Sequence, residues 1–185
     1  YMTRLSSPRE QKRSGRAGVY YHVSYLGKPH DYLWMSTTPP ALMYEELRKA
    51  YDTTADRIWL LNVGDIKSCE SAMNLFLAMA YDIDSFNYEN ISLYQARWLA
   101  NLFGDKYYED FLEITDTFYH QAFSRKPEFM GWGYQWATNK HGKERNTDTD
   151  FSFANYQEAD SRLAAYNRIG AKVEQILNEL PERCK

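Results

Sequence analysis

Polar side chains gather near the ends of two apolar segments in the first third of the chain. His22, Ser24 and Tyr25 end the first segment, and Asn62 and Asp65 end the second. Imidazole, phenol, amide and carboxylate groups bind polar ligands through hydrogen bonds or move protons during a reaction. Because the apolar residues lie further back along each segment, the pattern is typical of a catalytic edge rather than of one that serves stability.

The spacing of His22 and Tyr25 sets a geometric condition. Residues three apart on a regular strand point to opposite faces of a sheet. Both side chains reach one pocket only if the strand ends near Val23 and Tyr25 lies in the following loop, which the Gly27-Lys28-Pro29 turn favours. Structural roles stay open for the same groups: a hydrogen-bonded interior histidine in the first segment, and Asx turns or helix caps in the second.

Two strands and a helix are predicted to hold these groups. Residues 19–26 (VYYHVSYL) and 56–65 (DRIWLLNVGD) are rich in β-branched and aromatic residues, which predicts strands. Between them a helix begins at residues 37–40 (TTPP). Strands joined by a crossover helix are parallel, and parallel sheets bind ligands at the carboxyl ends of their strands. The nearly continuous apolar run at 58–61 predicts that both sheet faces are covered.

This strand pair is not a complete sheet. Two parallel strands leave both edges and at least one face open, whereas parallel sheets occur almost only as buried, multi-stranded sheets. We therefore expect the missing strands to come from sequence outside these 185 residues. The chain is interpreted as a fragment of a larger enzyme.

The rest of the chain is predicted to be helical. A capping box at residues 7–10 (SPRE) starts a short helix. Beyond the second strand, apolar residues at helical spacing predict an antiparallel bundle with helices at about 70–81, 91–103, 106–125 and 154–180. The apolar stripe expected on the last helix includes Leu163, Ile169, Val173 and Ile176. A polar stretch at about 131–150 is expected to be an irregular loop, so the chain is mostly helical overall.

Composition excludes several classes of function. The net charge is −3 with 25% charged residues, which gives no electrostatic footprint for nucleic acid. No apolar run approaches the roughly 18 residues that span a bilayer, so no membrane partner is expected. The two cysteines and four histidines lack metal-ligand spacing. We therefore predict no metal site, no disulfide framework and no cofactor.

Aromatic residues are unusually frequent, with 16 Tyr, 9 Phe and 5 Trp. Large amphipathic rings build cores and domain interfaces. Exposed rings also pack on the C–H faces of sugars, which is the functional alternative. Composition alone leaves both interpretations open.

Three segments carry a resemblance to a known family. Residues 18–25 (GVYYHVSY), 56–65 (DRIWLLNVGD) and 155–162 (NYQEADSR) are similar to glycoside hydrolase family 115, the xylan α-1,2-glucuronidases. The resemblance extends over nearly the whole chain. It implies the last β/α units of a TIM-like (β/α)8 barrel at residues 1–68, followed by a helical-bundle domain at 69–185. In the family, an N-terminal domain and most of the barrel precede these parts, and a β-sandwich follows them.

The resemblance also implies an activity and a set of substrate contacts. The parent enzyme would be an inverting hydrolase that removes glucuronic acid or 4-O-methylglucuronic acid from xylan. His22, Tyr25 and Asn62 match positions that line the glucuronate pocket, and Asp65 matches the motif. His22 and Tyr25 would donate hydrogen bonds to the sugar, and Asn62 would bridge two hydroxyls. The catalytic acid and base are not assigned, and we expect them upstream of residue 1.

Expected partners and location follow from the same resemblance. The substrate would be glucuronoxylan, the missing parts of the same protein would complete the barrel, and a homodimer is possible. The parent would be secreted or periplasmic, and the isolated chain would be inactive. Aromatic residues at 132, 134 and 136 would either grip xylan at a neighbouring subunit's active site or lie on the bundle in a solvent-exposed connection.

Two other functions compete with this interpretation. One is a non-catalytic helical interaction module, and the other is a TIM-barrel enzyme of another reaction class, since this fold hosts many reactions. Upstream strands with Asp or Glu at their tips would favour the hydrolase. An upstream glycine-rich phosphate loop or metal-ligand cluster would favour another reaction.

Overall fold

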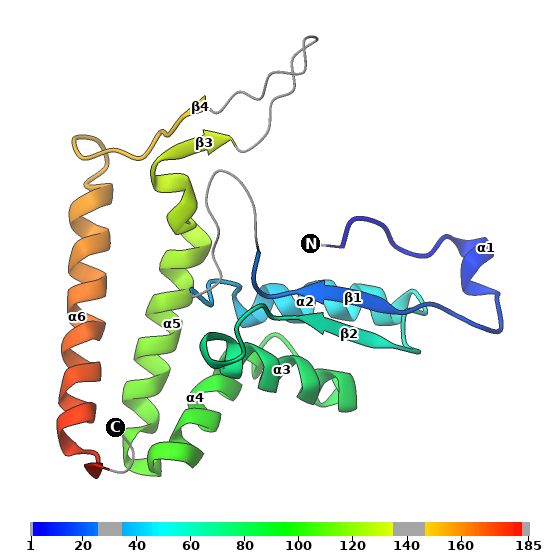
Figure 1. Ribbon diagram of the computed structural model, residues 1–185, viewed down its shortest axis with the longest axis horizontal. Coiled ribbons are helices and arrows are strands. Elements are labelled where there is room, and N and C mark those ends of the chain that lie inside the picture. Colours follow the sequence, from blue (N-terminus) through cyan, green and yellow to red (C-terminus); the bar gives the residue numbers. More distant parts are fainter. Residues whose placement is uncertain (1, 26–34, 135–146, 183–185) are drawn as a thin grey trace. The chain divides into compact units, whose positions relative to one another are not determined.

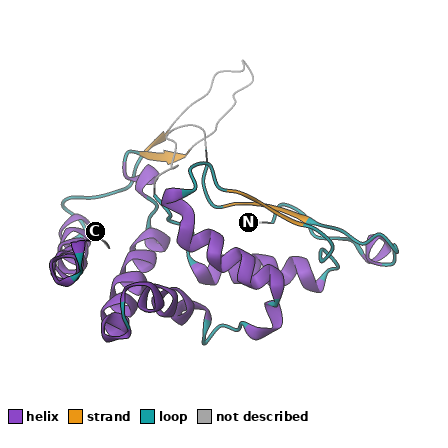
Figure 2. Cartoon of the chain, turned by 60° about the horizontal axis from the view of Figure 1, so that its bottom comes forward, coloured by secondary structure: helices purple, strands orange, loops and turns teal. Residues whose placement is uncertain are grey.

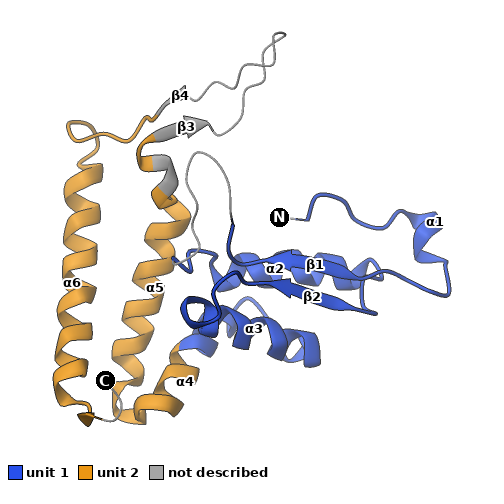
Figure 3. Ribbon diagram, in the orientation of Figure 1, with its two compact units in different colours: residues 1–25, 33–95 blue, residues 26–32, 96–185 orange. Residues whose placement is uncertain are grey.

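The structure is a computed structural model that describes residues 2–25, 35–134 and 147–182 (Figure 1). Most of these residues are helical, and strands are few and short (Figure 2). The chain divides into two compact units, one comprising residues 1–25 and 33–95 and the other residues 26–32 and 96–185 (Figure 3). The boundary falls inside helix α4 (Ile91–Phe103).

The first unit opens with α1 (Pro8–Gln11), a single helical turn held by the predicted capping box. The Glu10 amide donates to the Ser7 hydroxyl, and the Ser7 amide donates to a Glu10 carboxylate oxygen at 2.8 Å. These two bonds satisfy amides that a helix start would otherwise leave unpaired. The capping-box prediction is confirmed.

The two predicted strands form a parallel pair. Strand β1 (Val19–His22) lies beside β2 (Trp59–Asn62), and α2 (Pro40–Asp52) provides the crossover between them. Both strands are shorter than the sequence predicts, because the ladder ends where the Val23 amide donates to the Asn62 carbonyl. The turn predicted at 27–29 lies outside the described residues.

One face of this pair is buried and the other is exposed. On the buried face, Val19 and Tyr21 join a core with residues of α2 and of α3 (Glu70–Tyr81), and both helices lie on this side of the strands (Figure 2). On the other face, Tyr20 is 62% exposed and Leu60 is 57% exposed. Within the described residues α2 and α3 cover only one side, as expected of an incomplete sheet, and cover over the second face stays a prediction for the larger protein.

The connection from β2 to α3 is fixed by side-chain contacts. The 3-10 turn Lys67–Cys69 leads into α3, and the buried Cys69 thiol donates to the Val63 carbonyl at 3.4 Å. Burial raises the pKa of the Cys69 thiol, so it stays neutral in this position. A further 3-10 turn, Ile83–Ser85, follows α3 and is capped by the Asp82 carboxylate.

The second unit is built on long helices. A 3-10 turn (Asp105–Tyr107) joins α4 to α5 (Tyr108–Ser124), and the 3-10 turn Pro127–Met130 follows α5. Helix α6 (Glu158–Glu179) lies beside α5 (Figure 1). Residues of all three helices share one hydrophobic cluster. The predicted helices are confirmed, whereas the barrel, the four-helix arrangement and the domain boundary at residue 68 stay predictions.

The core face of α6 differs from the predicted stripe. Ile169 and Ile176 are buried as expected, but Leu163 is 60% exposed, and Arg162 is buried in its place. The Arg162 guanidinium donates to the carbonyls of Gln121 and Arg125, both at 2.8 Å. It therefore satisfies carbonyls at the C-terminal end of α5, where a positive charge also favours the helix dipole.

Two short strands occur where the sequence predicted an irregular loop. Strands β3 (Trp132–Tyr134) and β4 (Thr147–Asp148) pair in antiparallel fashion. Close to β4, the Asp150 carboxylate pairs with the Arg125 guanidinium at 2.7 Å, and this guanidinium also pairs with Glu158 at the start of α6. Residues 135–146, which include Trp136, lie outside the described residues.

Candidate functional site

The carboxyl ends of β1 and β2 bring together four polar or aromatic side chains: Tyr20, His22, Tyr25 and Asn62. We call them the strand-end cluster. His22 and Asn62 are directly opposite each other as the last pair of the parallel register. Because side chains alternate across a strand, Tyr20 and His22 share the face of the sheet that α2 and α3 leave uncovered.

Tyr25 lies beyond the end of β1, as the spacing condition required. Its ring stacks on the His22 ring, with centroids 5.7 Å apart and an interplanar angle of 24°. Burial raises the pKa of Tyr25, so the phenol remains a neutral hydrogen-bond donor near neutral pH. The predicted approach of His22 and Tyr25 is confirmed.

Tyr20 belongs to the cluster although sequence reasoning did not select it. Its ring lies 4.6 Å from the His22 ring, and its hydroxyl accepts a hydrogen bond of 3.1 Å from the Asn62 amide nitrogen. The available signal was strand periodicity, because residues two apart on a strand point to the same face. Tyr20 thus contacts two of the residues that the sequence predicted.

Asn62 is oriented by bonds at both ends of its amide. The oxygen accepts from the Gly64 amide at 3.4 Å, and the nitrogen donates to Tyr20. Gly64 has a positive φ of 61°, a conformation that glycine adopts at little cost. The turn role that the sequence left open is therefore present, and it coexists with a position in the cluster.

Asp65 lies apart from these contacts, in the turn between β2 and α3. Its backbone carbonyl accepts from the Ser68 hydroxyl at 3.1 Å, and the residue is exposed. The structure therefore joins three of the four predicted residues in one cluster and places the fourth in the following turn. Asp56, at the opposite end of β2, pairs with Arg16 at 2.8 Å.

The cluster offers hydrogen-bond donors and acceptors and aromatic faces. Within residues 2–25, 35–134 and 147–182, no group of three or more His, Cys, Asp or Glu residues is placed to hold a metal ion. No helix in this part of the chain is long and apolar enough to cross a membrane. The arrangement is suited to binding a hydroxyl-rich ligand, because it presents an amide, an imidazole and phenols without a paired acid and base.

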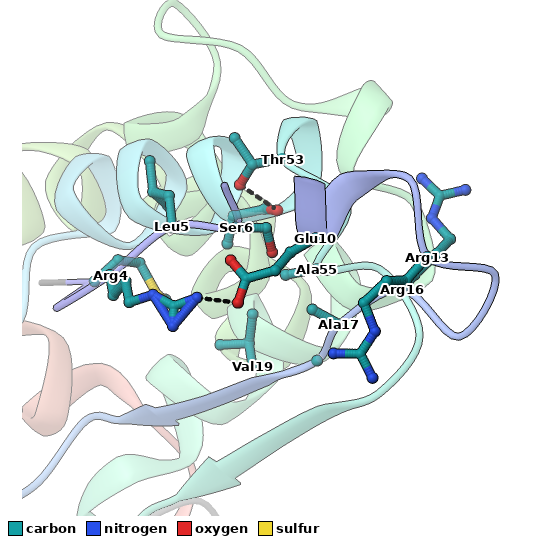
Figure 4. Close-up of a pocket in the computed structure, with 13 residues that line it drawn as sticks. Arg4, Leu5, Ser6, Glu10, Arg13, Arg16, Ala17, Val19, Thr53 and Ala55 are labelled. Carbon is teal, nitrogen blue, oxygen red and sulfur yellow. Dashed lines mark hydrogen bonds and ion pairs between the residues drawn. The ribbon is translucent and has the colours of Figure 1, made fainter. Parts of the chain in front are cut away.

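A cavity of about 240 Å³ lies at the other end of β1, beneath residues 2–17 (Figure 4). Arg4 and Glu10 form an ion pair inside it. The bond from Arg4 holds the pKa of Glu10 at about 2. Since Val19 begins β1 and His22 ends it, this cavity is separate from the strand-end cluster.

Comparisons with known proteins assign the chain to a family. Residues 1–129 match the family model described as glycosyl hydrolase family 115. A solved structure of a family GH115 4-O-methyl-α-glucuronidase with specificity for decorated arabinogalactans is 36% identical, with a TM-score of 0.80. The match covers 96% of this chain but only 23% of that chain. No curated protein matches the sequence. The chain therefore belongs to glycosyl hydrolase family 115.

Proposed function

We propose that this chain supplies part of the sugar-binding end of a glycoside hydrolase that removes glucuronic acid or 4-O-methylglucuronic acid side chains from xylan. The observation that carries the proposal is the strand-end cluster, because it lies where parallel α/β enzymes bind their ligands. Membership of family 115 supports the reaction class.

Each member of the cluster has a proposed role. His22 and Tyr25 donate hydrogen bonds to the uronate carboxylate or to ring hydroxyls, and a cationic His22 adds a charge-assisted bond. Asn62 bridges two hydroxyls through its amide. Tyr20 sets the rotamer of Asn62 through the 3.1 Å bond. These are positioning roles and not proton transfers.

Inverting hydrolysis requires two carboxyl groups roughly 6.5–9.5 Å apart, one as acid and one to activate water. In the part of the chain that the structure describes, Asp65 is the one carboxylate that closely follows the carboxyl end of β1 or β2. A single carboxylate does not serve both roles in one step. We therefore assign the acid and the base to parts of the parent enzyme outside this chain, and Asp65 to a substrate contact.

The uncovered face of β1 and β2 is assigned to the interior of the parent's barrel. Residues 1–68 then close the barrel, and 69–185 form the helical domain that follows it. Two observations support this: the exposed Tyr20 and Leu60 side chains, and the 23% share of the solved relative that the chain covers. By itself the chain would be inactive. A polymeric substrate places the parent outside the cytoplasm, either secreted or periplasmic.

A second candidate substrate is arabinogalactan that carries glucuronate side chains. It is favoured by the 36% identical relative, which is described as specific for decorated arabinogalactans. The proposed contacts in the cluster are the same for both polymers, because they address the glucuronate unit and not the backbone that carries it.

The test compares variants of the full-length parent enzyme on glucuronoxylan and on arabinogalactan. Released glucuronate is measured for His22→Ala, Tyr25→Phe and Asn62→Ala. Each should lower kcat/KM by about 10- to 1,000-fold on the natural substrate, as is typical for a lost polar contact to substrate or transition state.

Tyr88→Phe is the matched control for Tyr25→Phe. Tyr88 is also an exposed tyrosine of the first unit, and its hydroxyl bonds to Glu45. This variant should keep wild-type kinetics. Near-wild-type kinetics in all three cluster variants would show that the cluster does not bind the substrate. If the wild-type parent enzyme releases glucuronate from neither polymer, the proposed activity is wrong.

A further inference from the structure

A second cavity in the first unit lies at the starting end of β2, away from the strand-end cluster. Its volume is about 220 Å³, and it is lined by the last turns of α2 and α3, the approach to β2 and the 3-10 turn after α3. Drug-sized ligands occupy sites of about 300–1,000 Å³, so this volume suits one small ring rather than a longer oligomer.

Aromatic rings form part of its wall and rim. Trp59 and Tyr51 meet edge to face with centroids 6.5 Å apart, and the Trp59 indole is fixed by a 2.6 Å bond to the Ala55 carbonyl. Tyr81, the last residue of α3, is 94% exposed at the rim. An exposed ring offers a face on which the C–H groups of a sugar can pack.

Two carboxylates beside Tyr81 are held in place before any ligand arrives. One oxygen of Asp82 accepts from the Asp84 amide at 3.1 Å. One oxygen of Asp84 bonds to Arg48 at 2.5 Å, and Arg48 is itself fixed by Asp52. Within the described residues, the Oδ2 atoms of Asp82 and Asp84 receive no hydrogen bond. Fixed acceptors of this kind bind vicinal hydroxyls with little ordering cost.

The charge of the lining selects among sugars. Arg16 pairs with Asp56 and Arg48 pairs with Asp84, so Asp82 and Arg57 are the two lining charges for which the described residues show no ion pair. A lining whose charges balance in this way offers no excess positive charge to hold a uronate, because a confined charge needs a partner of opposite sign. It accepts a neutral sugar.

We propose that this cavity is a secondary carbohydrate site that holds one neutral sugar unit of the polysaccharide backbone, with Tyr81 as the stacking platform and Asp82 and Asp84 as hydroxyl acceptors. The choice of ligand rests on the proposed function, which makes a polysaccharide the substrate. The site would hold the polymer to the enzyme without contacting the glucuronate that is removed.

The test uses the full-length parent enzyme and two probes that contain no uronic acid, a neutral arabinoxylan and a neutral arabinogalactan. Affinity electrophoresis measures how strongly each dissolved polymer slows the protein. The wild type should be retarded by at least one polymer, and Tyr81→Ala should weaken that binding about tenfold, equivalent to about 1.4 kcal/mol. Tyr81→Ala is expected to fold, because the ring contributes little to burial and alanine favours helices.

The matched control is Tyr156→Ala, which removes a tyrosine that is 93% exposed in the second unit. It should bind like the wild type. Asp82→Asn gives an independent check, since the amide oxygen keeps the cap of the following turn while the charge is lost. It should weaken binding less than Tyr81→Ala does.

Two results would overturn the site: no retardation of the wild type by either polymer, or equal retardation of the wild type and Tyr81→Ala. Hydrolysis of a short glucuronate-bearing oligosaccharide is measured in parallel and should be unchanged in Tyr81→Ala. If the wild-type enzyme does not hydrolyse this oligosaccharide, the proposed function is refuted, whereas the secondary site is judged separately by the binding of the neutral polymers.

Discussion

Tyr20→Phe removes a single oxygen atom from the strand-end cluster and leaves the ring that lies 4.6 Å from His22. The lost group accepts a 3.1 Å hydrogen bond from the Asn62 amide nitrogen. A hydrogen bond between neutral groups contributes about 0.5–1.5 kcal/mol net. If Tyr20 positions Asn62 for the substrate, kcat/KM of the parent enzyme should fall by about 2- to 12-fold, the kinetic equivalent of that free energy.

A double-mutant cycle separates this positioning role from a direct contact with substrate. Initial rates of glucuronate release are measured for the wild type, Tyr20→Phe, Asn62→Ala and the double variant. Because Tyr20 acts through Asn62, its effect should largely vanish once Asn62 is alanine, which gives a coupling of about 0.5–1.5 kcal/mol.

Tyr20→Ala extends the same test. It also removes the ring beside His22 and should cost more activity than Tyr20→Phe does. Fully additive effects of Tyr20→Phe and Asn62→Ala would refute the positioning argument.

Three further predictions concern stability. Gly18→Ala should destabilise the fold by about 1–3 kcal/mol in urea unfolding, because the added Cβ would lie 2.5 Å from the carbonyl oxygen just before β2. Gly15→Ala, where a Cβ meets nothing within 4 Å, is the control and should be neutral. Arg162→Leu should cost about 1–3 kcal/mol, since the Arg125 carbonyl at the end of α5 loses the guanidinium, whereas the Gln121 carbonyl keeps its bond from the Arg125 amide. Arg162→Lys should recover part of the loss; equal midpoints for both variants would contradict this. The Arg125 guanidinium holds the pKa of Asp150 below its usual range, so this pair stabilises the fold above about pH 4 and the contribution is lost as the pH falls below that value. Tm measured between pH 5 and pH 2.5 should therefore fall less steeply in Asp150→Asn than in the wild type.

Local signals in the sequence predicted the elements that carry the cluster. The Ser7–Glu10 capping box, the strand–helix–strand order and the starts of α3 and α4 depend on nearby residues, and the structure shows them as expected. The approach of Tyr25 to His22 followed from strand periodicity and an early strand end. These features could be predicted from the sequence because each depends on residues that are close together in the chain.

Features that depend on residues distant in the chain could not be predicted from the sequence. Ile58 and Leu60 belong to an apolar run that suggests burial, yet both are exposed here because helices cover only one side of the strands. Arg162 occupies the core face of α6 since its guanidinium reaches carbonyls about forty residues earlier, a contact that helical periodicity does not encode. The pairing of β3 with β4 likewise joins segments separated by a long connection.

The alternation along β1 divides two tasks between neighbouring positions of the same strand. Val19 and Tyr21 anchor the strand to the helices, whereas Tyr20 and His22 project from the uncovered side. Substitutions at exposed positions usually change stability by no more than about 0.5 kcal/mol. Substitutions at positions 20 and 22 can therefore change the uncovered surface of the strand pair, while Val19 and Tyr21 keep the strand anchored to the helices.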